Sequence, residues 1–415
     1  MSAARTVAVL GAGAVGACAA LALQRRGFAV TLIDSGEPGS GASYGNAGIL
    51  SCSGVVPVAT PTILKRVPKM LLDPLSPLAV RWSYLPKLAP WLWQFVRAGA
   101  PDRVEAIARA LAPLSHACIG HWRDMLGTDV FRAQVREVGN LAVYKTDASF
   151  ETAQWAWDLR RRNGVRCEHL QGDALRQQEP ALSPDVKHGM FVPDGANVVD
   201  PQATVQSAAA QLRAAGGTVR LGKVERVERA ADGRPALRVD GASESFDMLT
   251  IAAGAHSRRF VRDLGGDLPL DTERGYHAML PTPAVAIRHA VSSGDHEFAI
   301  TPMASGVRLA GTVELGGLDA APNWERAKIL MRLAPTLFPG LDTRDAKLWM
   351  GFRPSMPDSL PVIGWLPGSD RVLLAFGHGH LGLSFGAVTG AMIGAMAAGA
   401  PPPVDPSPYR AERFG

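Results

Sequence analysis

The sequence is poor in cysteine and lacks the spacings that mark a metal site or a disulfide framework. Only four cysteines occur in 415 residues, scattered without a C-x-x-C pair: Cys18, Cys52, Cys118 and Cys167. This pattern argues against a structural metal and against a disulfide-stabilised secreted domain. We therefore expect no metal site, and a reducing cytoplasm is the simplest compartment.

Blocks of like charge are also missing. Charged residues make up 20% of the chain, hydrophobic residues 47%, and the net charge is only +5. These values describe an ordinary soluble globular protein. The lack of a basic block argues against a nucleic-acid partner. A small positive net charge suits an anionic cofactor and small anionic substrates.

The chain has no convincing transmembrane run, no internal repeat and no low-complexity tract. An apolar segment near the C-terminus, GAVTGAMIGAMAAGA at residues 386–400, is short and rich in glycine. Because a membrane-spanning helix needs about 20 apolar residues, we interpret this segment as a buried helix. The chain is long enough for two domains with sizeable cores.

The N-terminal segment VAVLGAGAVGACAALALQRRGFAVTLID, residues 7–34, is strongly patterned. Residues 6–10 predict a buried strand, and glycines follow in G-x-G-x-x-G spacing. A helix-like stretch then stops at Gly27, and a second strand at residues 29–33 ends at Asp34. Strand, glycines, helix and acidic residue together predict a dinucleotide-binding βαβ unit.

Each part of this unit has a physical role. Gly11 makes the turn, Gly13 lets the backbone approach a pyrophosphate, and Gly16 lets helix and strand pack closely. The helix N-terminus offers free N–H groups to the phosphates, and Asp34 is placed to accept hydrogen bonds from a ribose. A secretory signal after Arg5 would need only bulk apolarity. The signal interpretation leaves the glycine spacing unexplained, so we favour the nucleotide cradle.

The rest of the chain divides by pattern. A nucleotide-domain rhythm returns at residues 200–221, where Asp200 is a suitable helix N-cap and Pro201 a suitable first helical residue. Residues 265–345 alternate apolar and polar in short runs, as in an antiparallel sheet. The nucleotide domain is therefore predicted to be discontinuous, with the substrate domain inserted twice. Between the two, we predict helices at 102–126 and 149–162 and a strand at 140–144.

Four further stretches carry a family resemblance: SYGNAGILS at 43–51, ERGYH at 273–277, WMGFRPSMPDSLPVIG at 349–364 and GHGHLGLSFG at 377–386. Together with the first βαβ unit, and in this order, they resemble the D-amino acid oxidase-like family of FAD-dependent oxidoreductases. The resemblance is greatest to the bacterial D-amino acid dehydrogenases, and it covers nearly the whole chain.

The resemblance implies an α/β (α+β overall) fold. It combines a glutathione-reductase-like FAD-binding Rossmann domain with an inserted substrate domain of mixed or antiparallel sheet plus helices. The expected boundaries are 1–55, 195–260 and 346–415 for the FAD-binding domain, and 56–194 and 261–345 for the substrate-binding domain.

The resemblance also implies which residues hold FAD. Gly11, Gly13, Gly16 and Asp34 would bind the ADP half, and Ser43, Asn46, Ala47 and Gly48 would line the loop beside the pyrophosphate and the flavin ring. Val224 would contact the adenine through its backbone, and Gly254 would close over the dinucleotide. The last motif, with Gly377, Gly379 and Gly382, would run under the flavin. Since no cysteine lies in that motif, we expect non-covalent FAD, and Cys52 is interpreted as a small buried thiol.

For catalysis, the resemblance places Arg353 at the substrate carboxylate, which a planar guanidinium can bind with two charge-assisted hydrogen bonds. Tyr276 is expected to add a hydrogen bond to the carboxylate, and Arg274 to add charge. Arg274 and His277 are weaker candidates, because a strand alternates its faces. His380 is either an acceptor for the amine proton near neutral pH or a histidine satisfied by backbone groups in a glycine turn.

The expected reaction is oxidation of an amino acid at its α-carbon, with hydride passing to flavin N5 and the imine hydrolysing to a 2-oxo acid. The resemblance favours a D-amino acid and leaves a D-proline or hydroxy-D-proline type of substrate open. Two alternatives also remain open: an oxidase of sarcosine, glycine or another secondary amine, and a flavin-binding subunit without its own chemistry.

A basic stretch from Lys65 to Arg97 is rich in tryptophan and proline. Its cations and Trp82, Trp91 and Trp93 would suit docking on an anionic membrane, with a quinone or another carrier as electron acceptor. We favour the other interpretation, a lid or core of the substrate domain. The expected location is the cytoplasm, with peripheral contact to the inner membrane left open. The cations are Lys65, Arg66, Lys69, Arg81, Lys87 and Arg97.

Overall fold

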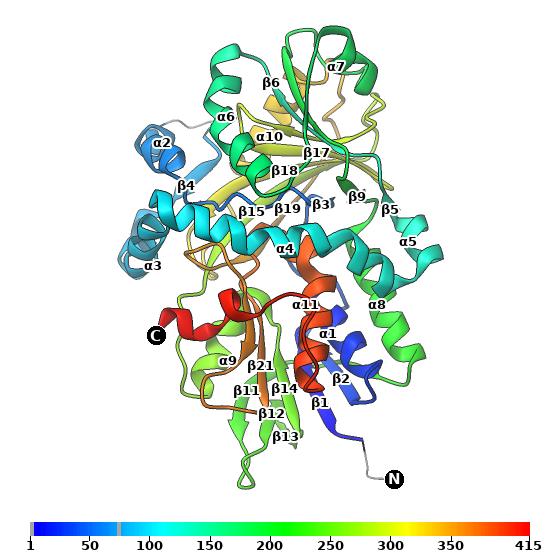
Figure 1. Cartoon of the computed structure of the whole chain (residues 1–415), viewed down its shortest axis with the longest axis vertical. Coiled ribbons are helices and arrows are strands. Elements are labelled where there is room, and N and C mark those ends of the chain that lie inside the picture. Colours follow the sequence, from blue (N-terminus) through cyan, green and yellow to red (C-terminus); the bar gives the residue numbers. More distant parts are fainter. Residues whose placement is uncertain (1–3, 73–75) are drawn as a thin grey trace.

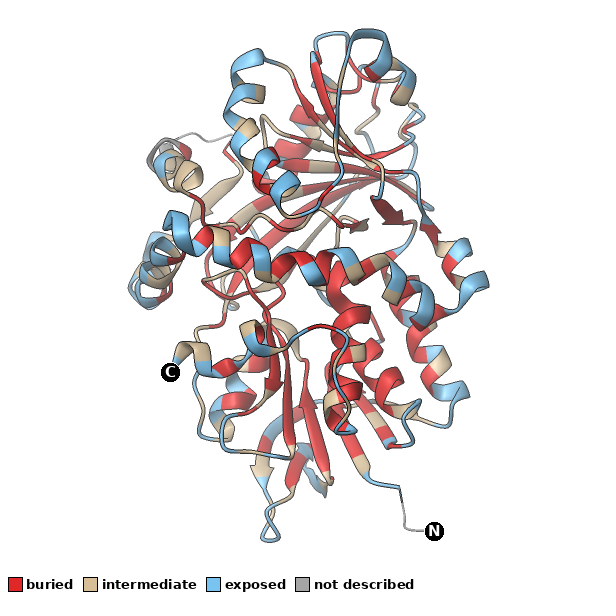
Figure 2. Cartoon of the chain, in the orientation of Figure 1, coloured by how far each residue is buried: buried red, intermediate tan, exposed pale blue. Residues whose placement is uncertain are grey.

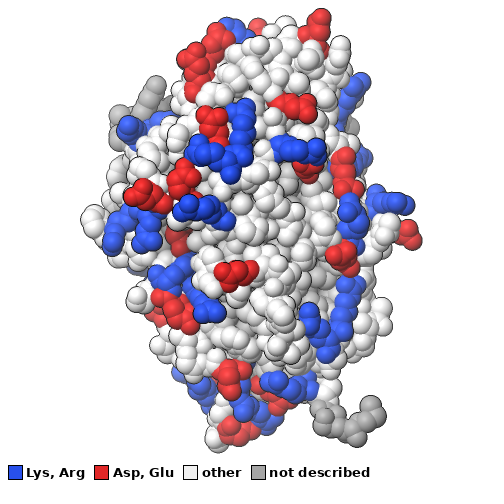
Figure 3. All heavy atoms as spheres, in the orientation of Figure 1, with Lys and Arg blue, Asp and Glu red and all other residues white. Residues whose placement is uncertain are grey.

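The computed structural model describes residues 4–72 and 76–415. Two large sheets dominate the chain (Figure 1). The smaller one, in the lower half of the view, carries both the N-terminal strand and the C-terminal helix. The larger one fills the upper half. Lys and Arg side chains alternate with Asp and Glu over the face drawn in Figure 3, with no field of a single sign.

The smaller sheet has six strands, and its parallel part is hydrophobic on both faces. The register pairs Val7 with Val30 and with Met248, and these strands run parallel, whereas the edge strand at Val362 is antiparallel to its neighbour. Parallel sheets need covering layers on both sides. In spatial order the strands are β10 (Thr218–Leu221), β2 (Ala29–Asp34), β1 (Thr6–Leu10), β14 (Met248–Ile251), β21 (Val372–Phe376) and β20 (Val362–Trp365).

Alternate residues of these strands point to two separate cores. Val7 and Val9 pack in the core formed with the helices, and Ala8 and Leu10 pack against a small antiparallel sheet. The helices are α1 (Ala14–Gln24), α4 (Pro101–Leu126), α8 (Pro201–Ala214) and α11 (Gly382–Ala397). The other layer consists of β11 (Val224–Arg229), β12 (Pro235–Val239), β13 (Ala242–Ser245) and α9 (Ser257–Asp263).

Helix α11 packs unusually close to α1 through a row of glycines. A Cβ added at Gly390 would lie 2.6 Å from the carbonyl carbon of Cys18, and one at Gly394 would lie 3.1 Å from the Cβ of Ala22. Figure 2 shows α11 as almost entirely buried. By length and composition the segment Gly379–Ala397 could cross a membrane, but 78% of its apolar window is buried within the protein. We therefore describe it as a core helix, as predicted.

The larger sheet has nine strands and is mixed. Most neighbours are antiparallel, but Ala290 pairs in parallel with Asn140, and Val313 with Leu78. One face packs on α10 (Glu325–Leu333) and near α7 (Gly172–Gln178). In order the strands are β19 (Lys347–Ser355), β15 (Asp271–Leu280), β18 (Gly306–Leu315), β17 (Phe298–Met303), β16 (Ala290–Ser293), β6 (Asn140–Tyr144), β8 (His188–Val192) and β7 (Glu168–Gln171), with β4 (Leu78–Val80) beside β18.

A third sheet of three short strands lies between the large ones, with its central strand β9 pairing with both neighbours. It consists of β3 (Ile49–Leu50), β9 (Ala196–Val198) and β5 (Val135–Arg136). The remaining helices are α2 (Pro61–Leu72), α3 (Leu85–Ala98), α5 (Thr128–Gln134) and α6 (Asp147–Arg162). Short 3₁₀ turns occur at Trp82–Tyr84, Gly254–His256, Ala334–Thr336, Gly379–Leu381, Ser407–Tyr409 and Ala411–Phe414.

The predicted α/β fold with a discontinuous nucleotide domain is confirmed, but two segments lie elsewhere than expected. Strand β19 belongs to the nine-stranded sheet, so the chain returns to the smaller sheet only after Ser355 and not at residue 346. Helix α4, assigned by pattern to the substrate domain, packs its apolar side against α11 of the nucleotide domain: the Trp122 indole donates a 2.8 Å hydrogen bond to the carbonyl of Leu383.

Candidate functional site

The turn from β1 to α1 is built so closely that two of its positions accept only glycine. Gly11 has a φ of 105°, and a Cβ there would lie 2.4 Å from the carbonyl oxygen of Ala252. A Cβ at Gly16 would lie 1.8 Å from the carbonyl oxygen of Gly11. Gly13 differs, because its nearest neighbour would be the Ser43 hydroxyl at 3.4 Å. Gly13 therefore presents bare backbone on the side where a phosphate approaches.

Two side chains hold the amides at this helix N-terminus. The Asp34 carboxylate, at the end of β2, accepts a 2.6 Å hydrogen bond from the Ala12 N–H, and the Ser43 hydroxyl accepts one of 3.0 Å from the Ala14 N–H. The acid thus lies beside the glycine turn, where a ribose of the bound dinucleotide would meet it. The cradle fits the ADP half of FAD, because the half-buried Gly13 and the positive dipole end of α1 suit a pyrophosphate.

The loop after Ser43 is fixed by a buried cation. Arg308 donates from Nη1 to the carbonyls of Tyr44 at 2.7 Å and Asn46 at 2.6 Å. Burial lowers the pKa of Arg308 to about 10, so the guanidinium stays charged at neutral pH. The Asn46 side chain accepts from the Gly48 N–H at 2.8 Å, and Gly48 adopts a φ of 74°. The half-buried Ala47 lies between them.

The C-terminal glycine turn meets this loop at the start of α11. Gly377 has a φ of 82°, and a Cβ there would lie 2.5 Å from Met356; Gly379 has a φ of 55°. The Ser384 hydroxyl donates to the carbonyl of Ile49 at 3.1 Å and accepts from the Ser51 N–H at 3.0 Å. Gly382, the first residue of α11, has no side-chain cap. Its free amides and those that follow suit the anionic edge of a reduced flavin.

Two further predicted cofactor positions lie outside the cradle and the loops described above. Gly254, with a φ of 55°, begins the 3₁₀ turn that follows β14, and a Cβ there would meet no atom within 4 Å. Val224 is buried at the start of β11, and its carbonyl already accepts a 3.0 Å hydrogen bond from Arg259. The adenine contact expected of the Val224 backbone stays a prediction.

Strands β15 and β19 present one face toward the two loops. The antiparallel register places Glu273 opposite Arg353, Gly275 opposite Gly351, and His277 opposite Trp349. Since alternate residues share a face, the side chains of this set lie on one surface, which we call the site face.

On the site face, the Arg353 guanidinium lies across Gly275, where a Cβ would come within 2.7 Å of it. It donates to the carbonyls of Thr312 at 3.1 Å and Gly311 at 3.3 Å, which fixes its plane. These bonds use two of the five N–H donors of an arginine, and the other donors have no protein acceptor in the described part of the chain. Arg353 is therefore held in place with donors free for a carboxylate.

Next to Arg353, an aromatic group closes the site face. His277 and Trp349 stack with ring centroids 5.1 Å apart, and Tyr44 lies 5.8 Å from Trp349. The His277 Nδ1 is 3.2 Å from the carbonyl of Gly45, an interaction that requires a hydrogen on Nδ1. Burial and the nearby Arg308 lower the pKa of His277 to about 3. His277 thus acts as a neutral anchor of the loop and not as a proton carrier.

Tyr276 and Arg274 lie on the opposite face of β15, so the contacts expected of them with a carboxylate at Arg353 are not made. The Tyr276 hydroxyl donates to the buried Glu314 and accepts from the Asn323 N–H at 2.9 Å. Arg274 forms an ion pair with Glu314 at 3.2 Å. The reason is strand alternation: both residues are an odd number of positions from Glu273. Arg274 and Tyr276 stabilise the sheet through contacts on the face opposite the site face.

His380 lies in the 3₁₀ turn ahead of α11 and lines a cavity of about 20 Å³ together with Glu273 and Ser355. Its ring is exposed, yet the surrounding protein and the charge of Arg353 lower its pKa to about 4. A histidine with this pKa is neutral at pH 7 and a weak base. The expectation that it takes up an amine proton near neutral pH is therefore not favoured.

Cys52 lies close to the flavin loop but is not a reactive thiol. Its side chain is buried, and burial raises its pKa to about 12. A thiol with that pKa is protonated at neutral pH and poorly nucleophilic. This environment agrees with the interpretation of Cys52 as a small core residue.

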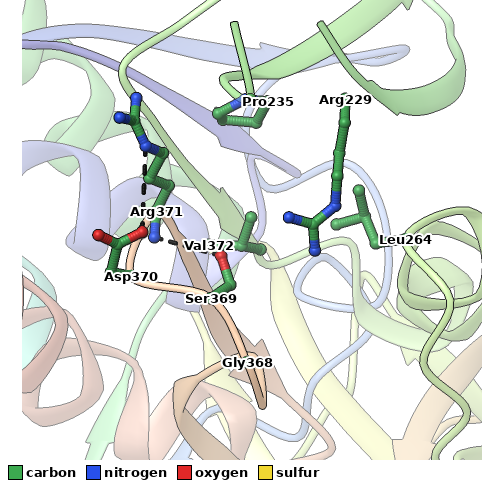
Figure 4. A pocket seen from close by; sticks show the side chains of 9 residues that line it. Arg229, Pro235, Leu264, Gly368, Ser369, Asp370, Arg371 and Val372 are labelled. Atoms are coloured by element: carbon green, nitrogen blue, oxygen red, sulfur yellow. Dashed lines mark hydrogen bonds and ion pairs between the residues drawn. The ribbon is translucent and has the colours of Figure 1, made fainter. Parts of the chain in front are cut away.

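A separate surface pocket of about 70 Å³ is lined by Arg229, Pro235 and Leu264 together with the turn from Gly368 to Val372 (Figure 4). It lies at the amino end of β21, and Arg371 is paired there with Asp370 at 3.9 Å. Ligands of parallel α/β sheets bind at the carboxyl ends of the strands. The pocket is therefore remote from the nucleotide cradle.

The cradle, the loop beside it and the start of α11 next to that loop define a dinucleotide-dependent oxidoreductase. The chain belongs to the family of FAD-dependent oxidoreductases, whose model matches residues 6–396. It is 39% identical over 424 residues to a D-amino-acid oxidase of Bradyrhizobium diazoefficiens, covering 99% of both chains. It is 32% identical to a D-amino acid dehydrogenase of Paramagnetospirillum magneticum, covering 98% of both.

Among solved structures, the glycine oxidase of Geobacillus kaustophilus matches with a TM-score of 0.73 at 21% identity over 98% of both chains. The family resemblance predicted from the four motifs is thus confirmed, and the cofactor is FAD. The protein is an FAD-dependent oxidoreductase. The absence of a covalent flavin link stays a prediction.

Several site residues were not found from the sequence. Glu273, Arg308 and Trp349 reach the site face only through strand pairing, and Tyr44 only through the loop fold. The local signal for Glu273 and Trp349 was present, because each is an even number of residues from a predicted site residue on the same strand: His277 and Arg353. The sequence does not show which alternate residues of the strand face the site, because that depends on which face of the sheet is buried.

Proposed function

We propose that this protein oxidises the α-carbon of a D-amino acid, and that Arg353 binds the substrate carboxylate. The observation that supports this most strongly is the placement of Arg353: its guanidinium lies over Gly275 on the site face, and two backbone carbonyls fix its plane while other donors stay unused by the described part of the chain. The two relatives named above carry D-amino acids in their names, which supports the D configuration. A proline-like D-substrate fits the same proposal.

The residues of the site would position the substrate and exclude water. FAD, when bound, supplies the acceptor for the hydride from the α-carbon. Arg353 would hold the carboxylate with paired hydrogen bonds, which fixes the α-carbon in orientation. Tyr44, His277 and Trp349 would cover one side of the substrate, and the amides at the start of α11 would stabilise negative charge on the cofactor.

The test is an anaerobic flavin spectrum of the purified protein with D-alanine, D-proline, hydroxy-D-proline, the L-enantiomers, glycine and sarcosine added singly. We expect D-amino acids to bleach the flavin. Arg353→Lys keeps the charge but loses the paired geometry, and we expect kcat/KM to fall by about 100-fold, corresponding to the loss of charge-assisted hydrogen bonds. Arg332→Lys, at an exposed position of α10, is the matched control.

The outcomes separate the candidate reactions. Bleaching only by glycine or sarcosine would replace the proposal by a secondary-amine or glycine oxidase, the activity named for the solved structure of similar fold. Bleaching by none would leave a flavin-binding subunit without chemistry. Reoxidation by air, compared with reoxidation by a quinone analogue, would identify the electron acceptor.

We also propose that α3 and the turn before it touch an anionic membrane surface from the cytoplasmic side. One side of α3 is core, since Leu88 and Trp91 are buried with Leu315. The other side is apolar and exposed: Trp82 is 68% exposed, and Trp93 is 66% exposed. The basic stretch therefore has one side that forms core and another that is available for a membrane, so both interpretations of its sequence apply. The side chain of Lys69 lies outside the described residues.

The same segment also exposes two cations. Lys87 and Arg97 are exposed on α3, and Val96 between them is 50% exposed. This combination of apolar rings and positive charge suits an anionic lipid surface. We expect the protein to sediment with phosphatidylserine vesicles at low salt and less so at high salt. The double variant Trp82→Ser and Trp93→Ser should not sediment. Failure of the wild type to bind at low salt would contradict the proposal.

A further inference from the structure

Glu273 is a buried carboxylate on the site face that the roles given above leave unused. It is 8% exposed, and it lies directly across from Arg353 on the neighbouring strand. Residues so paired have Cβ atoms about 5 Å apart. Nevertheless, no nitrogen of Arg353 approaches a Glu273 oxygen within 4.0 Å, and the guanidinium instead bonds to carbonyls of β18. The acid does not serve as the ion-pair partner of that arginine.

No hydrogen bond of good distance and angle reaches the carboxylate in the described part of the chain, although the nearby Ser355 hydroxyl favours its charged form. Glu273 lines the small cavity with His380 and Ser355, and the buried Ser355 hydroxyl has no partner of its own. Burial raises the pKa of Glu273, although Arg353 and Ser355 oppose this shift. A buried carboxylate without a partner is costly. A ligand that brings a positive nitrogen would remove this cost.

An amino acid supplies such a nitrogen. At neutral pH it is a zwitterion whose ammonium and carboxylate are attached to one carbon. The site face offers the complementary pair, a carboxylate and a guanidinium side by side on adjacent strands. We propose that Glu273 is a specificity-determining residue that binds the ammonium group of the substrate while Arg353 binds its carboxylate. This inference rests on the proposed function and extends it to the recognition of the nitrogen.

The proposal distinguishes two classes of ligand. A simple carboxylate such as propionate needs only Arg353 and is repelled by Glu273. D-Alanine, with the same carbon skeleton and an added ammonium, needs both residues. Glu273→Gln keeps the shape of the side chain and removes its charge. This variant should therefore weaken the binding of D-alanine, and it should leave the binding of propionate unchanged or strengthen it.

The experiment titrates the FAD-loaded protein anaerobically with D-alanine and separately with propionate, following perturbation of the flavin absorbance and, for D-alanine, its reduction. We expect Glu273→Gln to raise the half-saturating concentration of D-alanine by about 10- to 100-fold, the range for one charged hydrogen bond. The Kd of propionate should stay constant or fall. Glu179→Gln, which changes a buried acid at the end of α7 next to His289, is the matched control for loss of a carboxylate.

Equal weakening of both ligands, or no change for D-alanine, would overturn the proposal, because a merely structural role does not discriminate between them. Glu273→Asp keeps the charge and should retain the preference for D-alanine, and it replaces the first variant if Glu273→Gln does not fold. Failure of the proposed function would appear differently, as no reduction of the wild-type flavin by any D-amino acid. The spectral titration still measures the preference for the zwitterion in that case.

Discussion

The contact between α1 and α11 can be tested with one substitution made at two glycines. Gly390→Ala introduces a methyl group 2.6 Å from the carbonyl carbon of Cys18, whereas Gly120→Ala introduces one on the exposed side of α4, with no atom within 4 Å. Both changes replace glycine by alanine inside a helix, which by itself stabilises by about 0.8–1 kcal/mol. The packing environment is therefore the main difference between them.

At Gly390 the methyl group cannot be accommodated without movement. Contacts below 3.0 Å are essentially never seen for a Cβ, and the obstacle is backbone, which cannot rotate away. The two helices must separate locally, and overpacking of this kind costs about 1–3 kcal/mol. We expect Gly120→Ala to stabilise the protein and Gly390→Ala to destabilise it, with a difference of about 1–3 kcal/mol between the two variants.

Urea unfolding at one fixed FAD concentration measures this difference, since bound ligand adds to apparent stability. Gly394→Ala, where the nearest atom would be the Ala22 Cβ at 3.1 Å, should give an intermediate value. The reasoning would be refuted if Gly390→Ala proved as stabilising as Gly120→Ala. That result would mean that α11 can move away from α1 at no cost.

Three other changes test other parts of the structure. Asp34→Ala removes the acceptor of the Ala12 N–H and should raise the Kd of FAD by about tenfold, measured by fluorescence titration; an unchanged Kd would count against the cradle. Burial lowers the pKa of His378 to about 3, so below pH 6.5 only the unfolded chain is protonated there, and stability should fall by up to about 1.4 kcal/mol per pH unit between pH 6.5 and 3. His378→Asn should flatten that slope in urea titrations, and an unaltered slope would exclude this histidine as the cause. Arg308→Met should loosen the loop at Tyr44 and Asn46 and speed limited proteolysis there; equal cleavage rates would argue against the anchoring role.

The sequence predicted the parts of the fold that local physics determines. The strand at residues 6–10, the glycine turn and the N-cap at Asp200 were found, because each depends on neighbours within a few positions. The strand at residues 140–144 was found with its bounds, from its apolar run. Helix α4 was bounded correctly but assigned to the wrong layer, because a helical pattern does not say which surface it covers.

The site was predicted less completely, for a related reason. Arg353 stands in a recognisable motif, but the face of β15 could not be chosen from the sequence. Polar residues follow one another there as Glu273, Arg274, Tyr276 and His277, so no apolar alternation marks the inward side. The pairing with β19 determines which residues share a face: Glu273 lies opposite Arg353 on one face. Tyr276 lies on the other face and bonds to Glu314.

The burial of α1 has a consequence for how the protein is made. This helix follows the first strand, and nearly all of its residues are buried, many of them against α11 near the other end of the chain. Until residues 382–397 leave the ribosome, the nascent polypeptide carries an uncovered apolar helix at its beginning. Exposed surface of this kind is prone to aggregation. Because α11 is synthesised long after α1, the nucleotide cradle reaches its final form only once residues 382–397 have emerged.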